Sequence, residues 1–130
     1  MSEENDRPLF ILVDDDHINN SISRMMIMNT ISDAEVIVFD NPKAGLNFFQ
    51  SDLTHHPAKS VILLLNLNMP FMSGWEFLQH FNASNSDLKR IRIYILSSSI
   101  DPLDRKKADG LSTVKGFLTK PLSSESILSL

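Results

Sequence analysis

Short apolar runs alternate with amphipathic segments along this chain, and the alternation predicts five strands and five helices. The predicted strands cover residues 9–13, 35–39, 61–65, 91–96 and 115–118. Helical spacing, or a capping residue followed by proline, predicts helices that begin near residues 18, 42, 73, 101 and 123. The strands are mostly continuous apolar runs, which indicates that both of their faces are covered. The pattern therefore predicts an α/β fold: a doubly wound, five-stranded parallel sheet with helices on both faces.

Apolar residues at helical spacing predict which helix faces are buried. Ser73 and Glu76 have the spacing of a capping box at the start of the third helix. The residues expected on buried faces are Ile18, Ile22, Met25, Met26, Leu46, Phe49, Leu53, Leu78 and Phe81. Trp75 is expected either in the core or as a partly exposed anchor, and the last helix holds Ile127, Leu128 and Leu130. Met28 is expected at the border of the core, and Lys106 and Lys107 in solvent. The last helix has only about eight residues, below the usual mean, which fits truncation from a longer protein.

Length and composition limit the possible functions. The chain has 130 residues, which predicts one domain over 1–130, with 1–6 as a flexible N-terminus. The absence of cysteine excludes disulfides, thiolate metal sites and a cysteine nucleophile. A net charge of −4 argues against nucleic-acid binding. No apolar run is long enough to span a membrane and the N-terminus is acidic, so we expect a cytoplasmic protein.

Polar side chains follow four of the predicted strands. Parallel strands present their carboxyl ends at one edge, where ligands of such sheets bind. The residues expected to meet there are Asp14, Asp15, Asp16, Asn66, Asn68, Ser97, Ser98, Ser99, Thr119 and Lys120. Carboxylate and carbonyl oxygens suit Mg²⁺ rather than zinc. A lysine and a hydroxyl opposite the metal are suited to hold a phosphoryl oxygen.

Each of these residues also has a simpler interpretation. Asp14 to Asp16 could cap the following helix, where carboxylates favour the positive end of the helix dipole. Lys120, taken alone, could be a solvated side chain, and Ser97 to Ser99 could be ordinary loop residues. Their joint placement at neighbouring strand ends is what favours a shared site.

The motifs LVDDD, NLNMPFMSG and TKP, with the serine after the fourth strand, resemble the receiver domain of bacterial response regulators. The resemblance covers about residues 7–130. It implies a flavodoxin-like (CheY-like) fold with strand order 2-1-3-4-5. It also implies a signalling switch in a two-component phosphorelay, which accepts a phosphoryl group on an aspartate and is not a classical enzyme.

The resemblance also implies roles for individual residues. Asp14, Asp15 and the backbone carbonyl of Asn68 correspond to the protein ligands of Mg²⁺. Lys120 corresponds to the lysine that pairs with a phosphoryl oxygen, with a cis bond to Pro121. The switch and output positions correspond to Ser97 and Phe117, and the loop after the third strand to Met69, Pro70 and Gly74.

The resemblance further implies the partners of the chain. These are a histidine kinase or phosphotransfer protein, and a downstream protein on the face formed by the fourth helix, fifth strand and last helix. The sequence contains no DNA-binding module, so any transcriptional output would pass through another protein.

One residue departs from the family pattern at its centre. Counted back from Met69 and Pro70, the residue at the phosphoacceptor position is Asn66. A carboxylate can attack phosphorus and form an acyl phosphate, whereas the oxygen of an amide is a poor nucleophile. We therefore expect phosphorylation to be lost and Mg²⁺ binding to be weak, because one anionic ligand has become neutral. Fewer clustered carboxylates also reduce repulsion within the site.

Other functions and two origins of Asn66 have to be considered. A degenerate receiver could act as a phosphorylation-independent interaction module. A flavin- or nucleotide-binding protein would need a phosphate cradle after the first strand, where three aspartates would repel phosphate. A Mg²⁺-dependent phosphatase would need an aspartate in place of Asn66. The asparagine itself fits either a natural degenerate receiver or a change made in an ordinary one.

Overall fold

The computed structural model describes residues 7–84, 90–98 and 101–130. The expected flexible N-terminus, 1–6, and Ser99 lie outside these residues. Within the described ranges, no helix is both long and apolar enough to cross a membrane.

Five parallel strands form one sheet in the order β2-β1-β3-β4-β5, which confirms the expected topology. The strands are β1 (Leu9–Val13), β2 (Glu35–Phe39), β3 (Val61–Leu65), β4 (Ile91–Ser97) and β5 (Val114–Thr119). The helices are α1 (His17–Thr30), α2 (Pro42–Asn47), α3 (Gly74–Ser84), α4 (Pro102–Asp109) and α5 (Ser124–Leu128). Each predicted strand and helix is thus present: the strand bounds differ by at most one residue at either end, and every helix begins within one residue of its predicted start.

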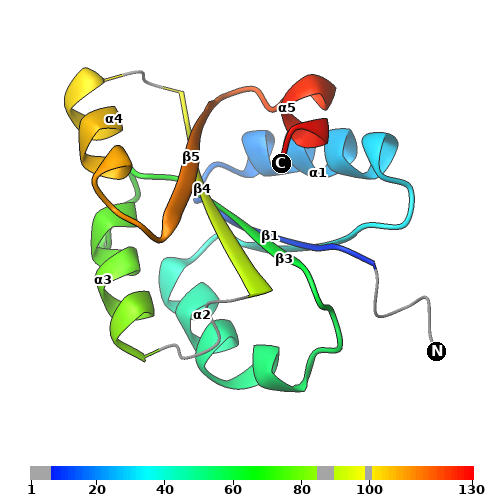
Figure 1. The fold of residues 1–130 in the computed structure, drawn as a ribbon, viewed down its shortest axis with the longest axis horizontal. Coiled ribbons are helices and arrows are strands. Elements are labelled where there is room, and N and C mark those ends of the chain that lie inside the picture. The colour runs from blue at the N-terminus through cyan, green and yellow to red at the C-terminus, as the bar shows by residue number, and fades with distance from the viewer. Residues whose placement is uncertain (1–6, 85–89, 99–100) are drawn as a thin grey trace.

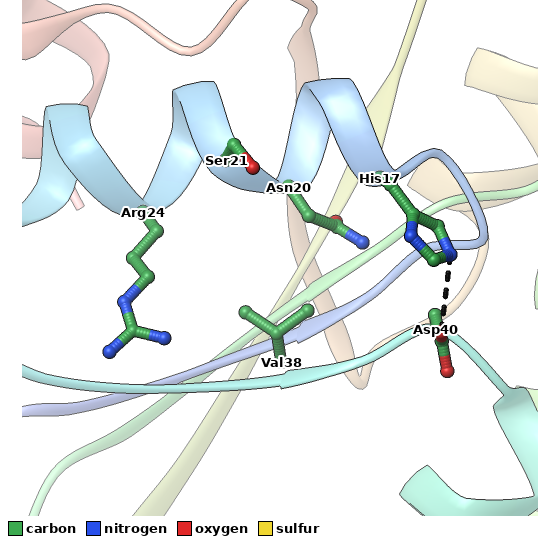
Figure 2. Close-up of a pocket in the computed structure, with 6 residues that line it drawn as sticks. All are labelled: His17, Asn20, Ser21, Arg24, Val38 and Asp40. Atoms are coloured by element: carbon green, nitrogen blue, oxygen red, sulfur yellow. Dashed lines mark ion pairs between the residues drawn. The ribbon is translucent and has the colours of Figure 1, made fainter.

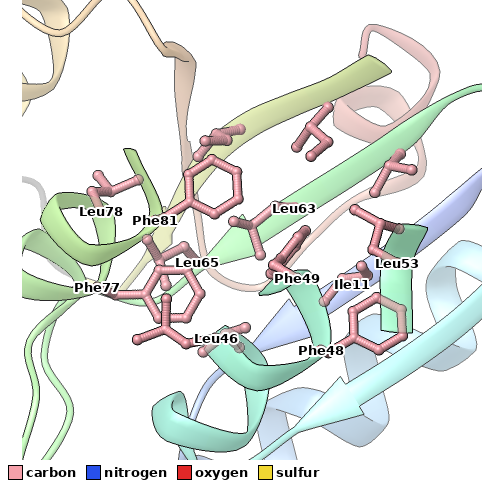
Figure 3. Packing of buried hydrophobic residues seen from close by; sticks show 14 of the residues in the cluster. Ile11, Leu46, Phe48, Phe49, Leu53, Leu63, Leu65, Phe77, Leu78 and Phe81 are labelled. Carbon is pink, nitrogen blue, oxygen red and sulfur yellow. The ribbon is translucent and has the colours of Figure 1, made fainter. Parts of the chain in front are cut away.

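Successive residues of the central strands point into two separate hydrophobic clusters. Leu63 belongs to the cluster under α2, α3 and α4, and its neighbour Leu64 belongs to the cluster under α1 and α5. Figure 1 shows α1 and α5 together on one face of the sheet, with α2 and α3 on the other. In the first cluster, Phe49 makes edge-to-face contacts with Phe77 and Phe81 (Figure 3). Burial on both faces explains why the strands carry no polar alternation.

The second helix is less regular than predicted. After α2, the chain continues as a π-helical turn, Phe48–Asp52, and then as a 3₁₀ turn, Leu53–His55. The predicted face of Leu46, Phe49 and Leu53 is buried, and Phe48 is buried beside it. The π turn fits this packing, since it brings two adjacent phenylalanines into one core.

The predicted buried face of the first helix is wrong in part: Met26 packs against the second cluster and Ile22 is partly buried, but the other predicted residues are exposed. Ile18 is 75% exposed and Met25 58% exposed, and Met28 is also exposed. The helix instead buries Asn19, Asn20, Ser23 and Ile27. The polar residues of this face lie inside because the two asparagines bind Asp14, and a search for apolar periodicity misses such a face.

Three other side chains define the packing of α3, α4 and α5. Leu128 is exposed, so the short helix α5 buries only Ile127. Trp75 is partly buried against the first cluster. Lys107 is exposed, as expected, and its Nζ also lies 4.7 Å from the centroid of the Trp75 ring, a cation–π contact between α3 and α4.

Candidate functional site

The carboxyl ends of the strands bring Asp14, Asn66, Ser97 and Lys120 to one edge of the sheet, as expected from their positions. Asp14 follows β1 and Asn66 follows β3, and each continues the ladder through its backbone N–H, to Phe39 O and Val13 O respectively. Lys120 follows β5, two strands beyond β3 in the sheet. Its Nζ lies 2.7 Å from Asp14 Oδ2, so this side chain reaches across the ends of the intervening strands.

Asp14 is the most enclosed charge of the site, with 3% of its surface exposed. Its Oδ1 accepts a hydrogen bond from the backbone N–H of Asp16 at 2.9 Å, and its Oδ2 accepts one from Asn19 Nδ2 at 3.1 Å as well as the Lys120 contact. Asn20 Nδ2 donates to the backbone carbonyl of Asp14 at 2.8 Å. These donors compensate for the burial of the carboxylate. Asn19 and Asn20 were not singled out from the sequence, although two amides one turn after an acidic motif could have pointed to them.

The three consecutive aspartates have different roles. Asp16 is exposed and caps α1, because its carboxylate accepts the backbone N–H of Asn19 at 3.0 Å. Asp15 is partly buried and lies near Asn66. The capping interpretation therefore holds for Asp16, while Asp14 and Asp15 belong to the shared edge.

Asn66 connects the loops that follow β1 and β3. Its Nδ2 donates to the backbone carbonyl of Asn68 at 3.0 Å and to Asp15 Oδ1 at 3.5 Å. The side chain is nearly buried, with 7% of the residue exposed. Gly74 allows this loop to close, since a Cβ at that position would lie 2.6 Å from the backbone oxygen of Asn66.

The remaining predicted residues lie on β4 and β5. Ser97 ends β4, is buried, and accepts the backbone N–H of Lys120 at 2.9 Å through its carbonyl. The peptide bond between Lys120 and Pro121 is cis, as the resemblance implied. Phe117 is partly buried and packs against the first cluster, on the face of the sheet that carries α4.

The donor set at this edge does not fit a tightly held Mg²⁺. The oxygens of Asp14, Asp15 and Asn68 are hard ligands of the right kind. However, the nitrogen of the Asn66 amide lies against two of them, and an N–H group cannot coordinate a cation. Among the residues that the structure describes, no group of three or more His, Cys, Asp or Glu side chains could hold a metal ion.

Two pockets flank the acidic edge. One, of about 450 Å³, is lined by Asp15, Asp40, Asn41, Pro42, Lys43, Pro70, Phe71 and Met72. The other, of about 300 Å³, lies between α1 and β2, where His17, Asn20, Ser21 and Arg24 face Val38 and Asp40 (Figure 2). In this second pocket, His17 Nε2 lies 3.2 Å from Asp40 Oδ2, and both side chains are exposed. The first pocket includes Asp15 of the shared edge, whereas neither pocket includes Lys120 or Ser97.

The fold is shared with solved structures of response regulators. A two-component response regulator from Cytophaga hutchinsonii matches with a TM-score of 0.86 and 26% identity, over 95% of this chain and 93% of the other. A receiver protein from Dyadobacter fermentans matches with a TM-score of 0.83 and 24% identity, over 94% and 93% of the two chains. A response regulator from Legionella pneumophila matches with 0.76 and 19%, over 95% and 94%. No curated protein matches the sequence significantly.

The family model of the response regulator receiver domain matches residues 10–130. This range includes all of β1 except Leu9, the strands β2 to β5, the helices α1 to α5 and every residue named at the shared edge. The chain therefore belongs to the response regulator receiver domain family.

Proposed function

We propose that this chain is a receiver domain of two-component signalling in which Asn66 occupies the phosphoacceptor position, so that the domain does not accept a phosphoryl group. Phosphorylation requires a carboxylate oxygen that attacks phosphorus, forms the new P–O bond and displaces the donor group. The neutral amide of Asn66 offers no such nucleophile. Membership of the receiver domain family indicates a signalling domain, and the loss of phosphorylation is our proposal.

The observation that carries this proposal is the position of Asn66. It is the first residue after the central strand β3, it is almost buried, and it lies within hydrogen-bonding distance of Asp15 and the Asn68 carbonyl. An aspartate here would face the acidic pair across the shared edge. Asp14 does not offer a replacement nucleophile, because it is only 3% exposed and its carboxylate is held by Asp16, Asn19 and Lys120.

Under this proposal, the other site residues have the same roles as in the family, but the metal ligands bind Mg²⁺ only weakly. Asp14, Asp15 and the Asn68 carbonyl retain only a weak affinity for Mg²⁺. Lys120 and Ser97 are the groups that would hold a phosphoryl oxygen, and Phe117 is the proposed output residue. Lys120 already has a partner in Asp14, with 2.7 Å between Nζ and Oδ2. No phosphoryl group is therefore needed to neutralise this lysine.

That internal pairing favours a second candidate function, a phosphorylation-independent interaction module. The proposed partners are a histidine kinase or phosphotransfer protein at the shared edge, and a downstream protein on the face of α4, β5 and α5. The two candidates differ in their use of a phosphodonor. A module binds its partner equally with and without acetyl phosphate, whereas a switch changes its affinity.

Mass spectrometry of the intact protein tests the proposed loss of phosphorylation. After incubation with acetyl phosphate and Mg²⁺, we expect no added phosphoryl group on the chain with Asn66. The matched variant Asn66→Asp is expected to gain one, located at residue 66 by peptide mapping. A phosphoryl group at residue 66 of the chain with Asn66 would overturn the proposal.

A further inference from the structure

The Asn66 amide contacts two oxygens that come from different loops. The backbone carbonyl of Asn68 belongs to the loop after β3, and Asp15 Oδ1 belongs to the loop after β1. Both oxygens are among the three that the family resemblance assigns to a metal ion. A single NH₂ group thus lies where a cation would otherwise join the two loops.

The partners of the amide determine its orientation. A side-chain amide has one acceptor end, the oxygen, and one donor end with two hydrogens. If the amide of Asn66 were rotated by half a turn, its oxygen would face a carbonyl oxygen and a carboxylate oxygen, with no hydrogen between them. The nitrogen therefore faces Asn68 and Asp15, and its two hydrogens can serve one oxygen each.

The carboxylate of Asp14, the third group that the resemblance assigns to the cation, also has hydrogen-bond donors within the protein. The carboxylate of Asp14 accepts N–H groups from Asp16, Asn19 and Lys120. Every oxygen group assigned to the cation therefore has a nitrogen donor from the protein itself. The buried carboxylate of Asp14 therefore needs no cation to compensate it, and the partly buried Asp15 has the Asn66 amide as a donor at 3.5 Å.

We infer that the Asn66 amide is an internal substitute for the cation: it holds the loops after β1 and β3 together and competes with Mg²⁺ for the oxygens of Asp15 and Asn68. This inference rests on the proposed function, since it explains how a receiver without its acceptor carboxylate keeps an assembled edge. It also gives the weak Mg²⁺ affinity a second cause besides lost charge. To bind at these oxygens, a cation would first have to displace the amide.

The variant Asn66→Ala separates competition from lost charge, because alanine and asparagine are both neutral. Mg²⁺ alone is titrated into each protein by calorimetry, without any phosphodonor. We expect the alanine variant to bind Mg²⁺ about tenfold more tightly than the natural chain, since two hydrogen bonds no longer have to be broken. Equal or weaker binding would overturn the inference. The exposed Asn47 of α2 supplies a control, and Asn47→Ala is expected to bind Mg²⁺ as the natural chain does.

Thermal unfolding gives a second readout that does not depend on measuring binding directly. The natural chain is expected to have the same Tm in EDTA and in Mg²⁺, because its loops are held without a cation. The Asn66→Asp variant is expected to unfold at a lower temperature in EDTA, where three carboxylates repel one another, and to regain stability in Mg²⁺. A Mg²⁺-dependent Tm in the natural chain contradicts the inference. Neither readout involves phosphorylation, so failure here is distinct from failure of the proposed function.

Discussion

Gly74 lies where the first turn of α3 approaches the end of β3 most closely. Its backbone N–H donates to Leu67 O at 2.8 Å, and a Cβ added at this residue would lie 2.6 Å from Asn66 O and 2.9 Å from Leu67 Cα. Backbone atoms cannot move aside as the end of a flexible side chain can. This glycine is therefore required by the close approach, and the position of Asn66 depends on it.

The variant Gly74→Ala is expected to lower the free energy of unfolding by about 1–3 kcal/mol, the usual effect of inserting an atom into a packed site. Gly110→Ala is the matched control, since a Cβ at Gly110 would lie 3.5 Å from Lys107 O, which is an ordinary van der Waals contact. That control is expected to change little or to stabilise slightly. Urea unfolding measures both, and equal effects of the two substitutions would contradict the role given to Gly74.

At the scale of the element, the buried face of α1 cannot be predicted from the spacing of apolar residues alone. Its apolar residues repeat at helical spacing. However, the contacts of Asn19 and Asn20 with Asp14 determine which face of the helix packs on the sheet. Among the described residues, Ser23 Oγ and Asn20 Oδ1 are buried without a hydrogen-bond partner. The face of α1 that packs on the sheet is therefore partly polar, and Ile27 supplies its fully buried apolar contact.

Substitutions on opposite faces of α1 test this orientation. Ile27→Ala is expected to lower the free energy of unfolding by about 2–5 kcal/mol, because a fully buried side chain leaves a cavity. Ile18→Ala, on the exposed face, is expected to change it by less than about 0.5 kcal/mol. Chemical denaturation distinguishes the two, and a large loss from the Ile18 substitution would mean that this face is covered.

At the scale of the whole molecule, the sheet and the location of the site followed from the sequence because strand burial and parallel topology leave strong local signals. The runs 9–13 and 61–65 are fully buried, so their composition alone indicated covered faces. The contacts within the site could not be predicted in the same way. The pairing of Lys120 with Asp14 and the orientation of the Asn66 amide join residues far apart in sequence, and these depend on three-dimensional packing.

The two hydrophobic clusters share one sheet, and this predicts that they unfold together. Leu63 and Leu64 are adjacent in β3 and both almost completely buried, yet they point to opposite faces. Neither cluster can lose its packing without exposing the strands that the other cluster packs against. Leu63→Ala and Leu64→Ala are each expected to cost about 2–5 kcal/mol and to shift one common transition.

Two probes check that expectation in each variant. Fluorescence of Trp75, the single tryptophan, reports on the first cluster, and far-ultraviolet circular dichroism reports on helices of both faces. In the natural chain and in both variants, the two denaturation curves should coincide, with a lowered midpoint in the variants. Leu103→Ala, on the exposed surface of α4, should leave the midpoint nearly unchanged. If the Leu64 variant moved only the dichroism curve, the α1–α5 face would unfold separately, and the shared sheet would not couple the two layers.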